Sequence, residues 1–318
     1  MLPTIKKLSD LKPEELKDKT VWLRVDFNVA IVNGVVTEGY RIDRSLETIN
    51  FLKNNGAKII LATHLGEGTA SLEPVVEYLK TKISLDGITI LPNLRSNPGE
   101  ESNSDELAHE WAASADIYVN EAFAASHREH ASIVGLPKLL PSYAGFNFVA
   151  EVENLSKCFT PTHPALLIVG GAKLESKQSV IDKFKPLVDK ILIGGKLVYE
   201  FLNNTDEQIV MSKELVRVED KILDIIITDE IKELVKNAKR IIWAGPMGMY
   251  DAGYAKGTLD LAEAVAQSEA ESIVGGGDTI AAIPAATLSQ FTFVSTGGGA
   301  MLQFLATGTL PGVEALKG

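Results

Sequence analysis

The sequence contains a single cysteine, Cys158, so its 318 residues cannot form an internal disulfide, and we expect this cysteine to be a packing residue. No run approaches the roughly 18 consecutive apolar residues of a membrane-spanning helix. The first residues include lysines but no apolar core of a signal peptide. The formal net charge of -11 argues against nucleic acid as the main partner. We therefore expect a cytoplasmic monomer that binds neither membranes nor nucleic acid.

Several signatures of nucleotide chemistry are also missing. The chain has no GxxxxGK[ST] loop, no glycine-rich kinase loop ahead of a V-A-I-K strand, and no dinucleotide fingerprint with an acidic residue on the next strand. His127 and His130 are spaced three residues apart, but no third ligand accompanies them, and zinc needs at least three. These absences argue against the familiar P-loop, protein-kinase and dinucleotide-binding sites, and against a zinc centre.

Apolar, β-rich runs alternate with segments of helical spacing along the whole chain. The runs that predict strands are 21–28, 58–66, 88–95, 117–121, 165–171, 190–195, 240–245, 272–277 and 291–297. The segments that predict helices are 45–54, 72–82, 104–114, 176–184, 228–237 and 256–268. This alternation is typical of α/β proteins, and it predicts two Rossmann-like domains, each a parallel sheet covered by helices.

The length of the chain allows two domains. Residues 143–157 form a long helical pattern without a strand, which predicts an interdomain helix that acts as a hinge. We place the N-terminal domain at residues 1–142 and the C-terminal domain at residues 158–302.

In the first half of the chain, the predicted strands end in charged or polar side chains. Ligands of parallel sheets bind at the carboxyl ends of strands, so these side chains are candidate ligands. Four of them form a cationic set from separate connections: Arg41, His64, Arg95 and Arg128. Because arginine binds phosphate or carboxylate oxygens two at a time, their convergence predicts a site for a small, multiply charged anion. The alternative is that each arginine is a surface residue or part of a structural ion pair.

In the second half, the predicted strands end in glycine. Gly170 and Gly171 precede Lys173 and Lys177, which a helix beginning near Ala172 would place one turn apart on one face. Backbone N–H groups and the positive end of a helix dipole at such a corner suit a polyphosphate. The alternative is an ordinary turn in which glycine serves only the backbone.

Two glycine triplets, residues 275–277 and 297–299, follow later strands. Asp278 and Thr279 come directly after the first triplet, where a carboxylate can hold a magnesium ion that bridges phosphates. A phosphate cradle in one half and an anion clamp in the other predict phosphoryl transfer across a cleft. Such transfer depends on positioning, magnesium and cations on the transferring oxygens.

The sequence resembles phosphoglycerate kinase through several motifs in the same order. They are RVDFNV at 24–29, HLG at 64–66, NLR at 93–95, SHREHAS at 126–132, GGAKLESK at 170–177, WAGPMGMYDAGYAKGT at 243–258, VGGGDT at 274–279, STGGGA at 295–300 and LPGVEALKG at 310–318. The resemblance implies reversible, Mg²⁺-dependent phosphoryl transfer between 1,3-bisphosphoglycerate with ADP and 3-phosphoglycerate with ATP, a step of glycolysis. It implies that the first domain binds phosphoglycerate, the second binds the nucleotide, a hinge closes them, and residues 303–318 return to the first domain.

Matched position by position, the resemblance implies a role for each small-molecule ligand. The implied phosphoglycerate ligands are Asp26, Asn28, Arg41, His64, Arg95 and Arg128. Arg41 and Lys173, with the backbones of Gly276 and Gly299, would steady the transferred phosphoryl group. The implied nucleotide ligands are Lys173, Lys177, Gly194, Gly195, Asp251, Gly276, Gly277, Asp278 and Thr279, and Asp278 would also hold magnesium.

The chain also departs from the family pattern. It is shorter, and it lacks a piece the size of a strand and a helix at 82–88 and another at 211–228, the second leading to the adenine pocket. Glu67 stands where the family has arginine, Ala244 where it has asparagine, and Lys196 where it has a third glycine. Asp251 is one methylene shorter than the family's ribose-binding glutamate. These departures motivate an alternative: a catalytically weak or inactive relative that binds a phosphorylated ligand in a regulatory or scaffold role.

Overall fold

The computed structural model describes residues 4–172 and 174–317. The chain divides into two compact units, and each is described by itself. The first unit comprises Met1–Val152 together with Thr309–Gly318, and the second comprises Glu153–Gly308. The division falls inside α6 (Phe146–Ser156), so this helix belongs partly to each unit.

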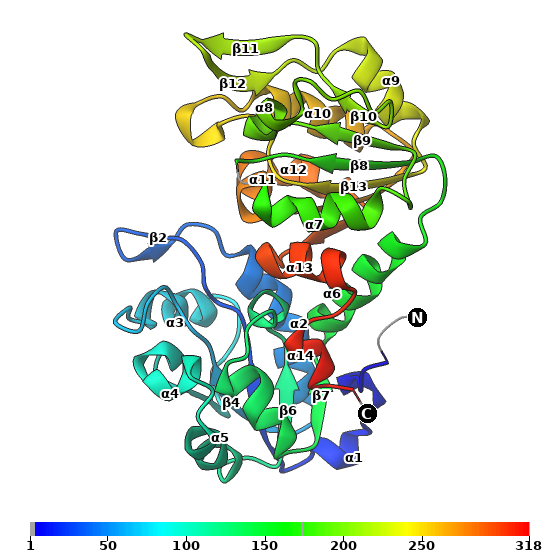
Figure 1. The fold of residues 1–318 in the computed structure, drawn as a ribbon. Helices are drawn as coiled ribbons and strands as arrows, with labels where there is room; N and C mark the ends of the chain where they lie inside the picture. Colours follow the sequence, from blue (N-terminus) through cyan, green and yellow to red (C-terminus); the bar gives the residue numbers. More distant parts are fainter. Residues whose placement is uncertain (1–3, 173, 318) are drawn as a thin grey trace. The chain divides into compact units, whose positions relative to one another are not determined.

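The first unit is built on a five-stranded parallel sheet (Figure 1). Its strands are β1 (Thr20–Arg24), β4 (Lys58–Ala62), β5 (Ile88–Ile90), β6 (Ile117–Asn120) and β7 (Ser142–Ala144), in the order β5-β4-β1-β6-β7. Its helices are α1 (Pro13–Leu16), α2 (Tyr40–Asn54), α3 (Glu73–Lys80), α4 (Pro98–Glu101), α5 (Asp105–Ala112) and α14 (Pro311–Glu314). The strand order reverses between β1 and β6, and ligands of such sheets bind at this switch point.

Burial explains why the central strand of the first unit is almost entirely apolar. Leu23 of β1 pairs in register with Leu61 of β4 and Val119 of β6, and all three side chains are fully buried. Trp22 packs on the opposite face against Trp111 and Tyr118, with ring centroids 5.3 and 5.9 Å apart. A strand covered on both faces cannot alternate polar and apolar residues, so the sequence reads as one apolar run.

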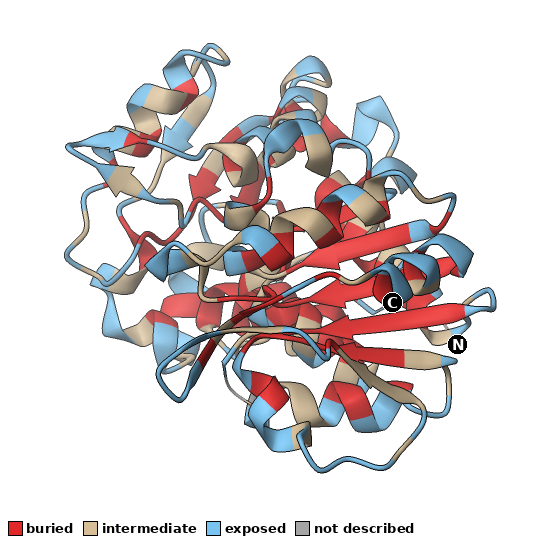
Figure 2. Ribbon diagram, turned by 90° about the horizontal axis from the view of Figure 1, so that it is seen from above, coloured by how far each residue is buried: buried red, intermediate tan, exposed pale blue. Residues whose placement is uncertain are grey.

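The second unit contains a six-stranded parallel sheet. Its strands are β8 (Ala165–Val169), β9 (Lys190–Ile193), β10 (Ile209–Met211), β13 (Arg240–Ala244), β14 (Glu271–Gly275) and β15 (Phe293–Ser295), in the order β10-β9-β8-β13-β14-β15. Its helices are α7 (Glu175–Phe184), α8 (Val198–Phe201), α9 (Asp229–Asn237), α10 (Lys256–Ala266), α11 (Gly277–Ala282), α12 (Ala285–Leu288) and α13 (Gly299–Thr307). Figure 2 shows strands that are buried along most of their length and helices that are buried on one side. This strand order is that of the Rossmann fold, with its switch point between β8 and β13.

The prediction of an α/β fold with parallel sheets covered by helices is confirmed, but several boundaries differ. The expected helix at 143–157 begins only at Phe146, because Ser142–Ala144 pairs with β6 as the edge strand β7. The helix expected near Ala172 begins at Glu175. The C-terminal segment that belongs to the first unit starts at Thr309 rather than at residue 303, because α13 belongs to the second unit.

Two β-hairpins were not anticipated from the sequence. One is formed by β2 (Ile31–Val32) and β3 (Val35–Val36), and the other by β11 (Leu215–Val218) and β12 (Lys221–Ile225). The second hairpin fills most of the segment 211–228, where the sequence is short. Among the described residues, no helix combines the length and the apolar character needed to cross a membrane.

Candidate active site

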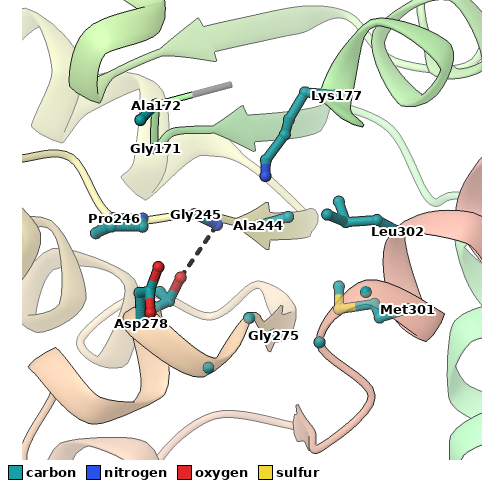
Figure 3. A pocket seen from close by; sticks show the side chains of 15 residues that line it. Gly171, Ala172, Lys177, Ala244, Gly245, Pro246, Gly275, Asp278, Met301 and Leu302 are labelled. Carbon is teal, nitrogen blue, oxygen red and sulfur yellow. Dashed lines mark hydrogen bonds between the residues drawn. The ribbon is translucent and has the colours of Figure 1, made fainter. Parts of the chain in front are cut away.

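The glycines of the second unit line a cavity of about 420 Å³ at the carboxyl ends of its central strands (Figure 3). The turns after β8, β13 and β14 and the start of α13 form its walls. Lys177 of α7 extends toward it from one side, and Asp278 of α11 from another. Lys173, the other lysine expected here, lies outside the described residues.

Two of these turns lie so close together that only glycine fits between them. Gly245 has a φ of +100°, and a Cβ added to it would lie 2.2 Å from the carbonyl oxygen of Gly170. The N–H groups of Gly170 and Gly171 donate to the carbonyl oxygens of Ala244 and Pro246, each at 2.9 Å. The glycines thus hold the ends of β8 and β13 together and leave backbone, rather than side chains, facing the cavity.

Two neighbouring residues at the start of α11 have different roles: Thr279 holds a turn in place, and Asp278 offers a carboxylate that a ligand can reach. Thr279 is fully buried, and its hydroxyl oxygen accepts a hydrogen bond from the N–H of Gly245 at 3.0 Å (dashed line in Figure 3). Its side chain therefore fixes the turn, and Thr279 is also one of the residues that line the cavity. Asp278 is exposed and makes no hydrogen bond or ion pair with another residue within 4–172 and 174–317. Gly277 borders open space, because a Cβ added to it would meet nothing within 4 Å.

A second cavity of about 180 Å³ adjoins the first, and the two share Gly171, Ala172, Pro246 and Asp278. The rest of its wall is formed by Gly195, the exposed Lys196, Gly248, Met249, Tyr250 and Asp251. Burial raises the pKa of Tyr250, and so do its hydrogen bond to Asp251 and the charge of Asp278.

Gly194 lines neither of these cavities. It packs against Met247, since a Cβ there would lie 2.4 Å from the sulfur of that residue.

In the first unit, Asp26 and Asn28 organise the end of β1. The carboxylate Oδ2 of Asp26 accepts a hydrogen bond from Nη1 of Arg41 at 3.0 Å. Burial alone would raise the pKa of Asp26, but the charge of Arg41, helped by that of Arg24 and by the N–H of Asn28, outweighs it and lowers the pKa. The side-chain oxygen of Asn28 accepts from the N–H of Gly66 at 2.9 Å, which ties β1 to the turn after β4.

His64 belongs to the set of residues expected to bind an anion, but its own side chain is not positively charged. Its side chain is 4% exposed, and Nδ1 lies 3.2 Å from Nη2 of Arg24. Burial, followed by the positive charge of Arg24, lowers the pKa of His64 to about 3. The interpretation of His64 as one of four cations is therefore wrong, because a ring enclosed beside an arginine stays neutral at physiological pH.

The two remaining arginines lie close to each other and to Glu101. Nη1 of Arg95 donates to the carbonyl oxygen of Gly66 at 2.6 Å, and Nε lies 2.9 Å from the carboxylate of Glu101. Burial and the charge of Arg95 lower the pKa of Arg128, while the charge of Glu101 opposes this effect. The negative charge of Glu101 therefore partly neutralises the two arginines to which an anionic ligand would bind.

We expect Glu101→Gln to lower the KM for an anionic substrate of this cluster by about two- to fivefold at low ionic strength. An ion pair as exposed as this one is worth at most about 1 kcal/mol, so the gain is modest and shrinks as salt is added. Steady-state kinetics over a salt series measures it. Glu110→Gln, which removes an exposed carboxylate from α5, is the matched control. A KM that rises in Glu101→Gln would mean that this carboxylate holds Arg95 in its binding position.

Other polar strand ends are structural. The oxygens of Glu121 accept hydrogen bonds from Thr48 and from the N–H groups of Asn147 and Phe148, so this buried carboxyl caps the start of α6. Burial raises the pKa of Glu121 to about 7 in spite of these bonds. Asn120 is fully buried, and its side-chain oxygen accepts a hydrogen bond from the N–H of Ala122. Among the described residues, no group of three or more His, Cys, Asp or Glu could hold a metal ion.

Sequence reasoning missed Glu101 and the positioning role of Thr279. Glu101 follows Arg95 by six positions with Pro98 between them, so their contact is not one of the i, i+3 or i, i+4 pairs that a helical pattern predicts.

Comparison with known proteins matches the chain to the phosphoglycerate kinase family model in three segments, residues 8–86, 81–227 and 203–308. The junctions of these segments fall at 81–86 and 203–227, near the two places where the sequence is short.

Proteins named phosphoglycerate kinase from Leptospira biflexa and Pseudothermotoga lettingae are 36% and 33% identical, over 98% of this chain and 98% and 99% of theirs. These alignments span 391 and 393 residues against 318 here, so the relatives contain segments that this chain lacks.

Solved structures lead to the same family. The structure of phosphoglycerate kinase from Coxiella burnetii has a TM-score of 0.83 and 29% identity, and covers 98% of this chain and 99% of that one. The corresponding crystal structure from Pyrococcus horikoshii has a TM-score of 0.84 and 25% identity, and covers 98% of both chains. The matching motifs, the two parallel sheets and these relatives together establish that this chain belongs to the phosphoglycerate kinase family, kinases that transfer phosphate to a carboxyl acceptor.

Proposed function

We propose that this protein catalyses reversible, Mg²⁺-dependent phosphoryl transfer between 1,3-bisphosphoglycerate with ADP and 3-phosphoglycerate with ATP, as a cytoplasmic monomer of glycolysis. The observation that supports the proposal most strongly is that one unit has a cavity lined by backbone, whereas the other has a cluster of arginine side chains. One unit offers a glycine-lined cavity with Lys177 and an exposed carboxylate, Asp278. The other offers Arg41, Arg95 and Arg128 at the strand ends of its sheet.

The phosphoglycerate would bind to Asp26, Asn28, Arg41, His64, Arg95 and Arg128. Arginine forks match carboxylate and phosphate oxygens, and the neutral ring of His64 can donate one hydrogen bond without adding charge. Because Asp26 already holds Arg41 at 3.0 Å, this guanidinium is oriented before substrate arrives. A guanidinium that is already oriented loses less conformational entropy when the substrate binds.

The nucleotide would bind in the second unit. Lys173 and Lys177 would contact its phosphates together with the backbones of Gly276, Gly277 and Gly299, and Asp251 and Gly195 would contact the nucleoside. Lys173 is assigned this role by its place in GGAKLESK. Arg41 and Lys173 would steady the transferred phosphoryl group once the hinge brings the two ligands together.

The residues around Asp278 fit a magnesium ion. Magnesium keeps several waters and is held by one or two carboxylates plus substrate phosphates, and Asp278 is an exposed carboxylate at the edge of a phosphate-sized cavity. When bound, the metal would neutralise charge that develops on the phosphate oxygens. The protein needs no general base, because the acceptor carboxylate has a pKa near 4 and is already ionised at neutral pH.

The function is tested by 3-phosphoglycerate-dependent ATP consumption in a coupled assay with magnesium. We expect activity in the natural protein and a collapse of turnover in Lys173→Ala, with 3-phosphoglycerate binding nearly unchanged. A folded protein without activity would contradict the proposal. It would favour the alternative of a binding-only relative if the protein is still stabilised against heat by 3-phosphoglycerate.

We expect Glu67→Arg to tighten 3-phosphoglycerate binding by about fivefold or more at low salt, because it replaces an anion by a cation beside the arginine cluster. The carbonyl oxygen of Glu67 accepts from the amide of Asn93 at 3.0 Å, and the adjacent Gly66 contacts Arg95, so the position is fixed near the cluster. Calorimetric titration measures the affinity. Unchanged or weaker binding would show that the side chain at position 67 is too far from the bound anion to affect its affinity.

A further inference from the structure

Arg24, the last residue of β1, is a charged side chain that is only 1% exposed. Its guanidinium donates three hydrogen bonds in three directions. Nε donates to the hydroxyl of Ser132 at 2.9 Å, Nη1 donates to the carbonyl oxygen of Val25 at 2.6 Å, and Nη2 lies 3.2 Å from Nδ1 of His64. A buried arginine with this many directed bonds cannot turn away without leaving polar groups unpaired.

The contact with Arg24 fixes the proton on His64. A guanidinium has only donors, so Nδ1 of His64 must be the acceptor of this hydrogen bond and carries no proton. In a neutral imidazole the single proton then resides on Nε2. The ring therefore has one N–H donor, on the nitrogen that Arg24 does not contact.

Arg24 is itself held by a buried carboxylate from α4. Glu100 is fully buried, with Oε1 3.8 Å from Nη2 of Arg24. Ser132 bridges the two groups: its hydroxyl accepts from Arg24 and donates to Oε1 of Glu100 at 2.6 Å, and its N–H donates to Oε2 at 2.9 Å. The hydroxyl of Tyr118 donates to the carbonyl oxygen of Ser132 at 2.7 Å, which fixes the bridge from the opposite side.

We propose that Arg24 is a positioning residue for the anionic substrate: held by Ser132 and Glu100, it locks His64 as the Nε2–H tautomer, so that the ring presents a donor to the substrate. This inference rests on the proposed function for the identity of the substrate. The opposite tautomer would turn a lone pair toward an anion and repel it. The wrong tautomer thus weakens binding even when every arginine of the cluster stays in place.

The first test is nuclear magnetic resonance of the ¹⁵N-labelled full chain. Long-range ¹H–¹⁵N spectra distinguish the two tautomers, and the His64→Gln variant assigns the resonance among the five histidines. We expect His64 to have an unprotonated Nδ1 and a protonated Nε2 from about pH 5 to 8. The groups whose charges act on this ring are Arg24, Asp26, Arg95 and Arg128. Protonated Nδ1, or titration within this range, would overturn the inference.

The second test is Arg24→Met, measured by the same spectra and by binding. We expect a mixture of tautomers and a 10- to 100-fold weaker affinity for 3-phosphoglycerate, as for a lost hydrogen bond to a charged group, with nucleotide affinity unchanged.

Lys58→Met is the control variant: it removes a charge from the start of β4 and should change neither the tautomer nor the affinity. A purely structural Arg24 would leave the tautomer as it is. If Arg24→Met does not fold, Ser132→Ala should shift both readouts in the same direction by less.

These readouts separate the inference from the proposed function. The tautomer and the affinity are measured without turnover, so a protein that has the expected tautomer but transfers no phosphate would contradict the proposed function alone.

Discussion

Asp278→Asn should lower magnesium-dependent turnover by about 100-fold or more and leave the fold intact. The substitution removes the negative charge that would hold the metal, and weakened metal ligation commonly reduces affinity or activity by such factors. Because Asp278 is exposed and unpaired among the described residues, its replacement disturbs no internal contact. Kinetics over a magnesium titration should show a higher metal requirement, together with an unchanged melting temperature.

The matched control for this substitution is Asp229→Asn. Asp229 is an exposed carboxylate at the start of α9 in the same unit, 3.4 Å from Lys232. We expect it to retain full activity. If both variants lose activity equally, the cause is the net charge of the unit; if Asp278→Asn retains activity at low magnesium, the metal is held elsewhere.

The sequence could predict the two sheets and the identity of the glycine turns because both depend on local patterns. Ala165–Val169 is apolar throughout and Arg240–Ala244 is apolar after its first residue, as central parallel strands must be, and glycines follow both where two turns approach each other closely. The three-residue strand β7 and the hairpin β2–β3 escaped prediction because elements this short carry no recognisable period.

What the sequence could not predict is the charge and orientation of individual side chains. His64 and Arg24 are 40 positions apart, and only the folded sheet brings them within 3.2 Å and makes the ring neutral. The contact between Arg95 and Glu101 also depends on the fold, since Arg95 lies in the 3-10 helix Leu94–Ser96 and Glu101 ends α4, a separate element. Thr279 lines the cavity as its place after the glycine triplet predicts, but the hydrogen bond that its hydroxyl accepts from the N–H of Gly245 could not be predicted. Such features depend on tertiary contacts that no local pattern encodes.

Glu100→Ala should lower the free energy of unfolding of the first unit by about 3–5 kcal/mol. Removal of one partner from a buried ion pair leaves the other charge uncompensated, which costs this much in other proteins. Here the remaining charge is Arg24, and Ser132 also loses the acceptor for its hydroxyl and its N–H. Urea unfolding followed by tryptophan fluorescence measures this free energy. Trp22 and Trp111 report on the first unit, and Trp243 reports on the second.

The pH dependence of this loss identifies its electrostatic origin. Burial would raise the pKa of Glu100, but His130, whose Nδ1 lies 3.6 Å from Oε1, the charge of Arg24 and the hydrogen bonds from Ser132 lower it to about 2. A lowered pKa means that the carboxylate stabilises the folded state above its unfolded pKa of about 4.5, and that this stabilisation is lost as the pH falls toward 2. The difference between natural protein and variant should therefore be full at pH 6 and shrink below about pH 4.5.

Two further variants distinguish the loss of charge pairing from the loss of packing. Glu101→Ala removes the adjacent but exposed carboxylate, and it should cost less than about 1 kcal/mol. The double variant Arg24→Met with Glu100→Leu removes both charges and retains volume, so it should recover most of the stability that Glu100→Ala loses. If the double variant is no more stable than Glu100→Ala, then packing around α4, and not the unpaired guanidinium, determines the cost.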